Sequence, residues 1–117
     1  MSGLTTYQML IDGQWVDAAD GGCFESIDPS TGEAWAMVPE ATAADVERAV
    51  KAAERAMYEG PWAGMTPTER GKYLRRLGDL LADKSEDLGR IETRDTGKMF
   101  TETRWQAKYI AEFFHFY

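Results

Sequence analysis

The sequence predicts an α+β fold, in which short β-hairpins precede about four helices. Two turn signals before residue 40, Asp12-Gly13 and Asp28-Pro29, separate short extended runs. From residue 42 onward, apolar residues recur at helical spacing, and two threonines occupy helix-capping positions. We therefore expect a β-hairpin layer over residues 1–40 and a helical segment over residues 42–117.

The extended runs are expected to form two hairpins. The first covers residues 8–16, because Asp12-Gly13 is a strong signal for a two-residue hairpin turn. In the second, Pro29 presets φ for a turn and Gly32 can take the left-handed conformation. Residues 1–6 look like a loose lead-in. The strands should form a small antiparallel layer, which is not stable alone.

The first two helices carry clear start signals. Thr42 with Asp45 has capping-box spacing, and this helix should run to about Tyr58, before Gly60-Pro61. Trp62 and Met65 should lie in a connector that folds back onto the core. The second helix begins with Thr66-Pro67-Thr68-Glu69. Its Gly71 and Gly78 mark close contacts with other elements, and the residues expected to be buried on it are Leu74, Leu77, Leu80 and Leu81.

Two further helices are expected. Ser85 should cap the third, Leu88 and Ile91 should form its buried edge, and Asp95-Thr96-Gly97-Lys98 should end it. The fourth begins near Thr101. Its broad aromatic face favours a core role, with a ligand path as the alternative, and comprises Trp105, Tyr109, Ile110, Phe113, Phe114 and Tyr117. This helix reaches Tyr117 without a stop signal, which predicts a fragment of a longer chain.

Composition narrows the function classes. The chain has 117 residues, 44% of them apolar, enough for one domain with a core. Its formal net charge of −7 makes nucleic acid and anionic membrane surfaces poor partners. A single cysteine and the lack of a leader or a long apolar run favour a reducing, cytoplasmic setting.

Catalytic motifs are sparse. The sequence has no Gly-x-Gly-x-x-Gly fingerprint, and its only histidine, His115, is expected to be solvated beside Glu112. Thr96-Gly97-Lys98 lacks the upstream glycine of a phosphate loop, so it is better read as a helix C-cap. Cys23 precedes the second hairpin without a neighbouring base, so we expect a structural thiol rather than a nucleophile.

Several motifs, in order and at this spacing, are together specific for one family. They are Ile11-Asp12-Gly13-Gln14-Trp15-Val16, Asp28-Pro29-Ser30-Thr31-Gly32-Glu33, the helix from Thr42 to Met57, Gly60-Pro61-Trp62, Arg70-Gly71-Lys72-Tyr73-Leu74-Arg75-Arg76-Leu77, Glu92-Thr93-Arg94-Asp95-Thr96-Gly97-Lys98 and Glu112-Phe113-Phe114-His115-Phe116-Tyr117. The chain resembles the amino-terminal segment of the aldehyde dehydrogenase superfamily. Asp28 stands where that family often has Asn, and Met99 where it often has Pro.

The resemblance implies an NAD- or NADP-dependent enzyme that oxidises an aldehyde to a carboxylic acid. This segment would form the start of the NAD(P)-binding domain of a larger α/β fold. The family's catalytic cysteine, general-base glutamate, oxyanion-binding asparagine and Rossmann glycines would lie beyond Tyr117. We therefore assign no catalytic or cofactor-binding residue here and expect the chain alone to be inactive. The aldehyde and the choice between NAD and NADP stay open.

The resemblance also implies two sites. Main-chain oxygens of Ser26 and Ile27, with the Asp95 carboxylate, would hold a sodium or potassium ion, which prefers oxygen ligands. The alternative is that Asp95 only bonds backbone groups where the third helix ends. Tyr109 would border the aldehyde entrance and help to set substrate choice.

The last helix also predicts association. Trp105, Ile110, Phe113 and Phe114 would form a large exposed apolar patch if nothing covered them, so we expect self-association and a homo-oligomer. A second functional hypothesis is a free-standing helical interaction module without catalysis. The unfinished last helix separates the two hypotheses, because a free-standing module would normally close its apolar face and cap its end.

Overall fold

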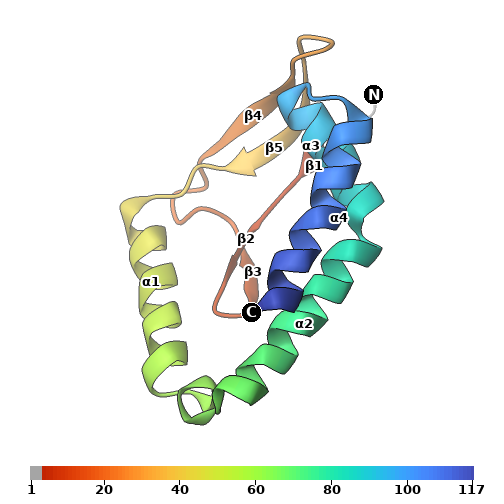
Figure 1. Cartoon of the computed structure of the whole chain (residues 1–117). Helices are drawn as coiled ribbons and strands as arrows, with labels where there is room; N and C mark the ends of the chain where they lie inside the picture. Colours follow the sequence, from red (N-terminus) through yellow and green to blue (C-terminus); the bar gives the residue numbers. More distant parts are fainter. Residues whose placement is uncertain (1–3) are drawn as a thin grey trace. The chain divides into compact units, whose positions relative to one another are not determined.

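A computed structural model describes residues 4–117 and confirms a mixed strand and helix fold with four α-helices (Figure 1). Residues 1–3 lie outside the described part. The strands are β1 (Thr5–Thr6), β2 (Met9–Ile11), β3 (Gln14–Val16), β4 (Cys23–Asp28) and β5 (Glu33–Pro39). The helices are α1 (Ala43–Tyr58), the 3-10 turn η1 (Pro61–Gly64), α2 (Pro67–Asp83), α3 (Ser85–Thr96) and α4 (Phe100–Phe116).

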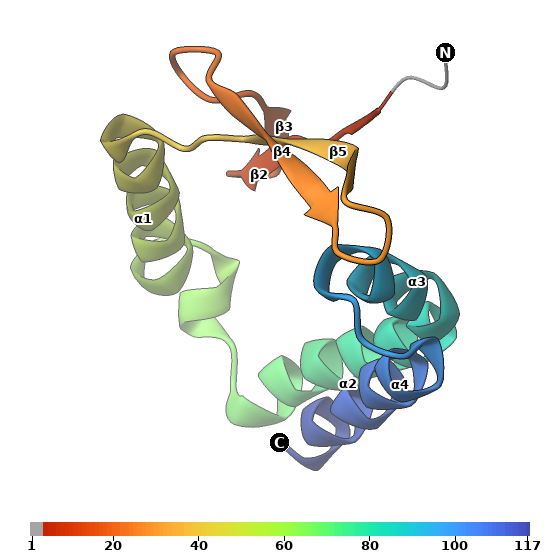
Figure 2. The ribbon, with the colours of Figure 1, turned by 90° about the horizontal axis from the view of Figure 1, so that it is seen from above.

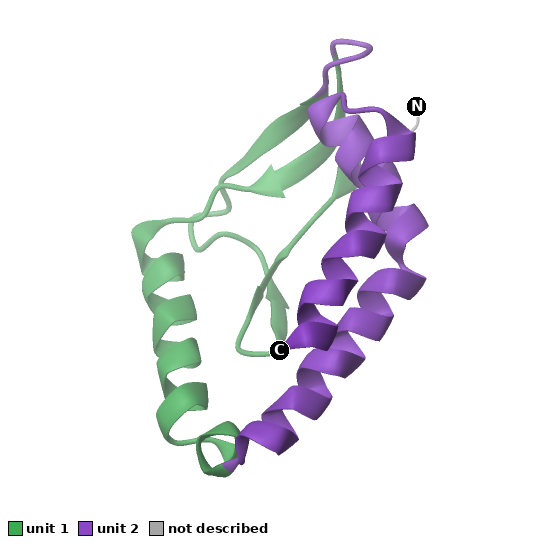
Figure 3. Ribbon diagram, viewed as in Figure 1, with its two compact units in different colours: residues 1–27, 33–64 green, residues 28–32, 65–117 purple. Residues whose placement is uncertain are grey.

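The chain divides into two compact units, shown in green and purple in Figure 3. Unit 1 comprises Met1–Ile27 and Glu33–Gly64, and unit 2 comprises Asp28–Gly32 and Met65–Tyr117. The strands end at Pro39 and the helices begin at Ala43, as the sequence predicts. The contacts nevertheless group α1 with the strands, because α1 packs against β2 and η1.

The first hairpin is confirmed. Strands β2 and β3 are antiparallel, with Met9 opposite Val16 and Ile11 opposite Gln14. Asp12 and Gly13 both have positive φ, 54° and 73°, as a two-residue turn that matches the strand twist requires. The second hairpin is also confirmed, because β4 and β5 are neighbours and Gly32 has φ 73°.

The expected single antiparallel layer is wrong, as is the loose lead-in at Thr5 and Thr6. These two residues form β1, which pairs in parallel with β5 through Thr5 opposite Ala36 and Thr6 opposite Met37. The order β1-β5-β4 is one sheet, and β2-β3 is another. A parallel pair joins segments that are distant in sequence, so no local turn signal announces it.

Unit 1 depends on a buried carboxylate at the start of α1. Asp45 is only 1% exposed. Its Oδ2 accepts hydrogen bonds from Thr42 N (2.9 Å) and Thr42 Oγ1 (2.8 Å), and Asp45 N donates back to Thr42 Oγ1 at 3.3 Å, which completes the predicted capping box. The same oxygen accepts from Ala19 N at 3.0 Å, so it fastens the loop before β4 to the helix. These bonds, that from Ala19 first, lower the pKa of Asp45.

Helix α2 begins as the sequence predicts. Thr66 and Glu69 form a capping box, with Pro67 in the first helical position. The bond from Thr66 N to the Glu69 carboxylate lowers the pKa of Glu69. The connector residues Trp62 and Met65 are half-buried. Helix α3 follows α2 after one residue, Lys84.

Two helix ends differ in detail from the sequence expectation. Ser85 does not cap α3, because Lys84 occupies the N-cap position without a side-chain cap. Lys84 N donates to Leu80 O, while Lys84 O accepts from Leu88 N, so one residue ends α2 and begins α3. Met99 precedes α4, which starts at Phe100. Gly97 ends α3 at φ 75°, which confirms the predicted C-cap.

Small residues hold unit 2 together. Helix α4 packs against α2 and α3, and Figures 1 and 2 both show α4 lying beside these two helices. The α4 residues buried there are Thr103, Ala107 and Ala111. A Cβ on Gly89 would lie 2.8 Å from the backbone of Arg104, so α3 and α4 touch at backbone distance. Thr103 Oγ1 donates to Gly89 O at 2.9 Å and lies 2.9 Å from Thr93 Oγ1.

The prediction that large apolar residues on α2 and α3 are buried is wrong for most of them. Leu77 and Leu80 are 42% and 51% exposed, Leu88 and Ile91 are also exposed, and Leu74 and Leu81 are half-buried. The physical reason is the close approach of the helices. Backbones this near leave room for Gly, Ala and Thr at the contact, so the longer side chains lie outside it.

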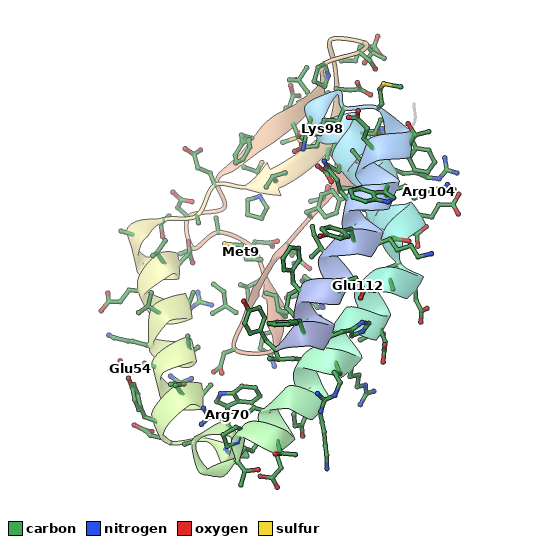
Figure 4. All side chains as sticks on the ribbon, in the orientation of Figure 1. Met9, Glu54, Arg70, Lys98, Arg104 and Glu112 are labelled. Carbon is green, nitrogen blue, oxygen red and sulfur yellow. The ribbon has the colours of Figure 1, made fainter. Side chains whose placement is uncertain are left out.

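The carboxylate of Asp45 predicts acid sensitivity of unit 1. Its folded pKa lies below the value in the unfolded chain, near 3.9. The stabilisation is therefore present above that unfolded value and is lost as pH falls through the folded pKa. Asp45→Asn should unfold at lower urea than wild type at about pH 7, with the difference shrinking toward about pH 2.5. The control is Glu54→Gln, on an exposed side chain of α1 (Figure 4). An unchanged gap between wild type and Asp45→Asn at both pH values would contradict this assignment.

The two glycines of α2 should respond oppositely to alanine. At Gly71 a Cβ would meet only the Arg75 guanidinium, at 3.6 Å, so Gly71→Ala should stabilise the chain by about 0.5–1 kcal/mol. At Gly78 a Cβ would lie 2.6 Å from the His115 ring and 3.0 Å from Ala111 O. Gly78→Ala should therefore destabilise by about 1–3 kcal/mol. Urea denaturation of both variants checks this, and equal effects would count against the packing described.

Candidate functional site

A ladder of aromatic rings runs along the outward side of α4. The Trp105 and Tyr109 rings stack nearly parallel, with centroids 5.0 Å apart and planes inclined at 7°. Tyr109 and Phe113 meet edge to face at 5.5 Å. These spacings of four residues place the three rings on one face of the helix. All three side chains are about half exposed or more, so the face is open in the described chain.

The ladder borders a groove of about 310 Å³, lined by Tyr109, Glu112, Phe113, Phe116 and Tyr117. Four of the five lining residues are aromatic, and Glu112 (labelled in Figure 4) adds the single carboxylate. The face is exposed among residues 4–117, as the sequence predicts if nothing covers it, so its core role stays a prediction. The alternative, a ligand path, also stays a prediction, and the apolar lining of the groove is of the kind that binding sites have.

His115 is not the solvated residue that the sequence suggested. Its Nε2 lies 3.0 Å from Asp79 Oδ1 on α2, and the side chain is only 31% exposed. The ring occupies the space that the missing Cβ of Gly78 leaves open. Gly78 was the only sequence signal for this contact, because His115 lies far from Gly78 along the chain.

The turn between β4 and β5 is organised by Asp28. Its Oδ1 accepts from Ser30 N (2.8 Å) and Ser30 Oγ (2.6 Å), and its carbonyl accepts from Gly32 N. The Ser30 hydroxyl bond is the largest cause of a lowered pKa at Asp28, and the charge of Arg94 acts in the same direction. Pro29 packs beside Gly97, 3.3 Å from where a Cβ would stand there. Two of the motifs noted in the sequence therefore meet within unit 2.

The residues of the predicted ion site lie on different elements. Ser26 is in β4, where its Oγ accepts from Trp35 Nε1 at 3.1 Å, and Ile27 follows it. Asp95 is exposed in the last turn of α3. Ser26 and Ile27 belong to unit 1 and Asp95 belongs to unit 2, so the site stays a prediction. Among residues 4–117, no group of three or more His, Cys, Asp or Glu side chains is placed to hold a metal ion.

Comparison with known proteins identifies the family. A sequence model described as "Aldehyde dehydrogenase family" matches residues 15–117, which is most of the chain. The chain belongs to the aldehyde dehydrogenase family. It corresponds to the amino-terminal segment that the sequence motifs indicated.

Individual aldehyde dehydrogenases and a related enzyme show the same likeness. The chain is 45% identical over 111 residues to the (Z)-2-((N-methylformamido)methylene)-5-hydroxybutyrolactone dehydrogenase of Acinetobacter baylyi, covering 95% of this chain and 22% of that protein. An NAD-dependent aldehyde dehydrogenase from Sinorhizobium meliloti matches with a TM-score of 0.91 and 36% identity, over 97% of this chain and 23% of its own. A mutant betaine aldehyde dehydrogenase from Staphylococcus aureus, in complex with NAD+, matches with a TM-score of 0.88 and 37% identity, over 97% of this chain and 23% of its own.

The chain therefore spans less than a quarter of the length of each of these three relatives. Cys23 is an exposed thiol at the start of β4, beside a small pocket of about 200 Å³ in unit 1. Its proposed structural, non-catalytic role stays a prediction. Within residues 4–117, no helix has the length and apolar character needed to cross a bilayer.

Proposed function

We propose that this chain is the amino-terminal segment of an NAD(P)-dependent enzyme that oxidises an aldehyde to a carboxylic acid. The family match over residues 15–117 carries the proposal. The NAD+ complex of the Staphylococcus aureus relative supports the choice of cofactor. The single cysteine and the acidic composition favour a cytoplasmic enzyme.

Within this enzyme the segment supplies a binding surface rather than reacting groups. The groove along α4 is apolar and aromatic, which suits the hydrocarbon part of an aldehyde. Tyr109 lies in both the ring ladder and the groove, so it is the residue through which this surface would influence substrate choice. The covalent step of the family needs a cysteine nucleophile, which the remainder of the enzyme would provide.

The second candidate is an interaction module without catalysis. The observation that favours it is the exposed apolar face of α4, since such patches commonly mark protein interfaces. The same face would support the predicted homo-oligomer. Both candidate functions give α4 a role. Only the enzyme requires that α4 side chains change the kinetic constants for an aldehyde.

The enzyme proposal predicts a selective effect of Tyr109. In the complete enzyme, Tyr109→Ala should raise KM for a bulky aldehyde such as benzaldehyde by about tenfold, because it removes one ring from the groove. KM for NAD+ should not change. Steady-state NADH production measures both constants, with the exposed Tyr58 of α1, changed to Ala, as control.

Two results would decide against this proposal. Failure of the complete protein to produce NADH or NADPH from any aldehyde would exclude the enzyme assignment, and equal effects of Tyr109→Ala and Tyr58→Ala would exclude the role of the groove. The 117-residue chain by itself should produce no NADH. Activity of this chain that disappears in Cys23→Ala would show that the nucleophile has been misassigned.

We also propose that main-chain oxygens of Ser26 and Ile27 and the Asp95 carboxylate bind sodium or potassium in the complete enzyme. A weakly held monovalent cation suits backbone carbonyls with one carboxylate. The complete enzyme should melt at a higher temperature in sodium or potassium chloride than in choline chloride of equal ionic strength. Asp95→Ala should abolish this difference, and Asp83→Ala, at the end of α2, should retain it. A difference that survives in Asp95→Ala would exclude this carboxylate as a ligand.

A further inference from the structure

Three arginines from two helices gather around the ring of Phe100 in unit 2. The guanidinium of Arg90, on α3, lies 4.6 Å from the centre of this ring, and that of Arg104, on α4, lies 5.8 Å from it (Arg104 is labelled in Figure 4). Arg94 follows Arg90 by four residues, so the two share one face of α3. One half-buried ring therefore lies beside several positive charges.

A pocket opens at this cluster. Its volume is about 240 Å³, and its lining consists of Arg90, Thr93 and Arg94 from α3 and Phe100 from α4. The Thr93 hydroxyl lies 2.9 Å from that of the fully buried Thr103. The pocket is therefore formed by two helices, and a hydrogen bond ties its lining to the contact between them.

The positive charges of the cluster are only partly balanced. Arg90 Nη2 forms an ion pair with Glu86 Oε1 at 2.9 Å. Arg94 lies close enough to Asp28 for their charges to attract. Arg104 forms no ion pair with any of residues 4–117. One positive charge is therefore left without a carboxylate partner in the described part of the chain.

This arrangement suits a small anion with several oxygen atoms. Guanidinium groups bind phosphate and carboxylate oxygens through paired N–H donors. The net charge of −7 disfavours large polyanions, which extend over the whole surface. A small anion responds mainly to the charges near it, because salt screens exposed charges beyond about 10 Å. The local arginines therefore outweigh the acidic composition at this pocket.

We propose that the pocket beside Phe100 binds a phosphate group. Arg90 and Arg94 line the pocket and donate to the oxygens, while Arg104 strengthens binding through its charge across the ring. Phosphate fits better than a carboxylate, because its larger negative charge and tetrahedral oxygens can be shared among guanidinium groups that come from two helices. Glu86 competes for Arg90, so binding is weak. The site lies apart from the aromatic groove and goes beyond the proposed aldehyde oxidation.

The first test titrates the complete protein with inorganic phosphate in a calorimeter, with chloride holding the ionic strength constant. Wild type should show saturable binding, and Arg90→Gln should weaken it about tenfold. The control is Arg76→Gln, on an exposed arginine of α2, which should bind as wild type does. Absence of saturable binding to wild type, or equal weakening by both variants, would overturn the proposal.

The second test uses a variant that should bind better. Glu86→Gln removes the carboxylate that competes for Arg90, so it should strengthen phosphate binding about threefold. A gain in affinity cannot come from partial unfolding. Glu47→Gln, which removes the partner of Lys51 on α1, should leave the affinity unchanged. Unchanged or weaker binding in Glu86→Gln would contradict the proposal.

The third test separates the sources of the phosphate group by titrating glycerol 3-phosphate and acetate. Tighter binding of glycerol 3-phosphate than of inorganic phosphate would support a site for a phosphorylated metabolite. The reverse order would support a site for the free ion. Acetate binding as tightly as phosphate would overturn the choice of phosphate. No measurement contains an aldehyde or NAD+, so a failure here would leave the proposed aldehyde oxidation intact.

Discussion

The close approach of α4 to α2 and α3 is the constraint on which the candidate site depends. Only small groups fit where the helices touch: Gly78, Gly89, Ala107 and Ala111, with Thr103 fully buried among them. Because α4 turns its small residues inward, Trp105, Tyr109 and Phe113 lie on the other side of the helix, while Phe114 is half-buried. The ring ladder and its groove are therefore a consequence of the packing and not a separate feature.

Side-chain hydrogen bonds add specific contacts to the close packing of small residues. The fully buried Thr103 hydroxyl donates to the Gly89 carbonyl between two helices, and an unpaired hydroxyl there would cost about 1–3 kcal/mol. Asp45 performs the corresponding task in unit 1, since one oxygen serves the α1 cap and the Ala19 amide. Asp28 holds the turn that carries Pro29 to Gly97. Each contact joins a local motif to a partner elsewhere in its own unit.

Local signals predicted the elements well, and long-range pairing limited the rest. Asp12-Gly13, the capping boxes at Thr42 and Thr66, and the Gly97 cap each specify a conformation through nearby atoms, so the sequence sufficed. The parallel pairing of Thr5 with Ala36 and the ring of His115 against Gly78 depend on distant residues. The periodic leucines correctly predicted the helices but not the faces on which the helices touch. Such a pattern shows which side of a helix is apolar, and it does not show which side approaches a neighbouring helix. The role of Tyr109 at the aldehyde entrance comes from the family resemblance alone and stays a prediction.

The most direct test of this account compares the two sides of α4 by urea denaturation. Ala111→Leu places a larger side chain at the buried contact and should lower the free energy of unfolding by about 1–3 kcal/mol. Phe113→Ala removes a ring from the outward side, where the side chain is 53% exposed, and should cost several times less. Tolerance of Ala111→Leu together with a large loss from Phe113→Ala would contradict the account, because it would mean that the aromatic side of α4 is the one that packs.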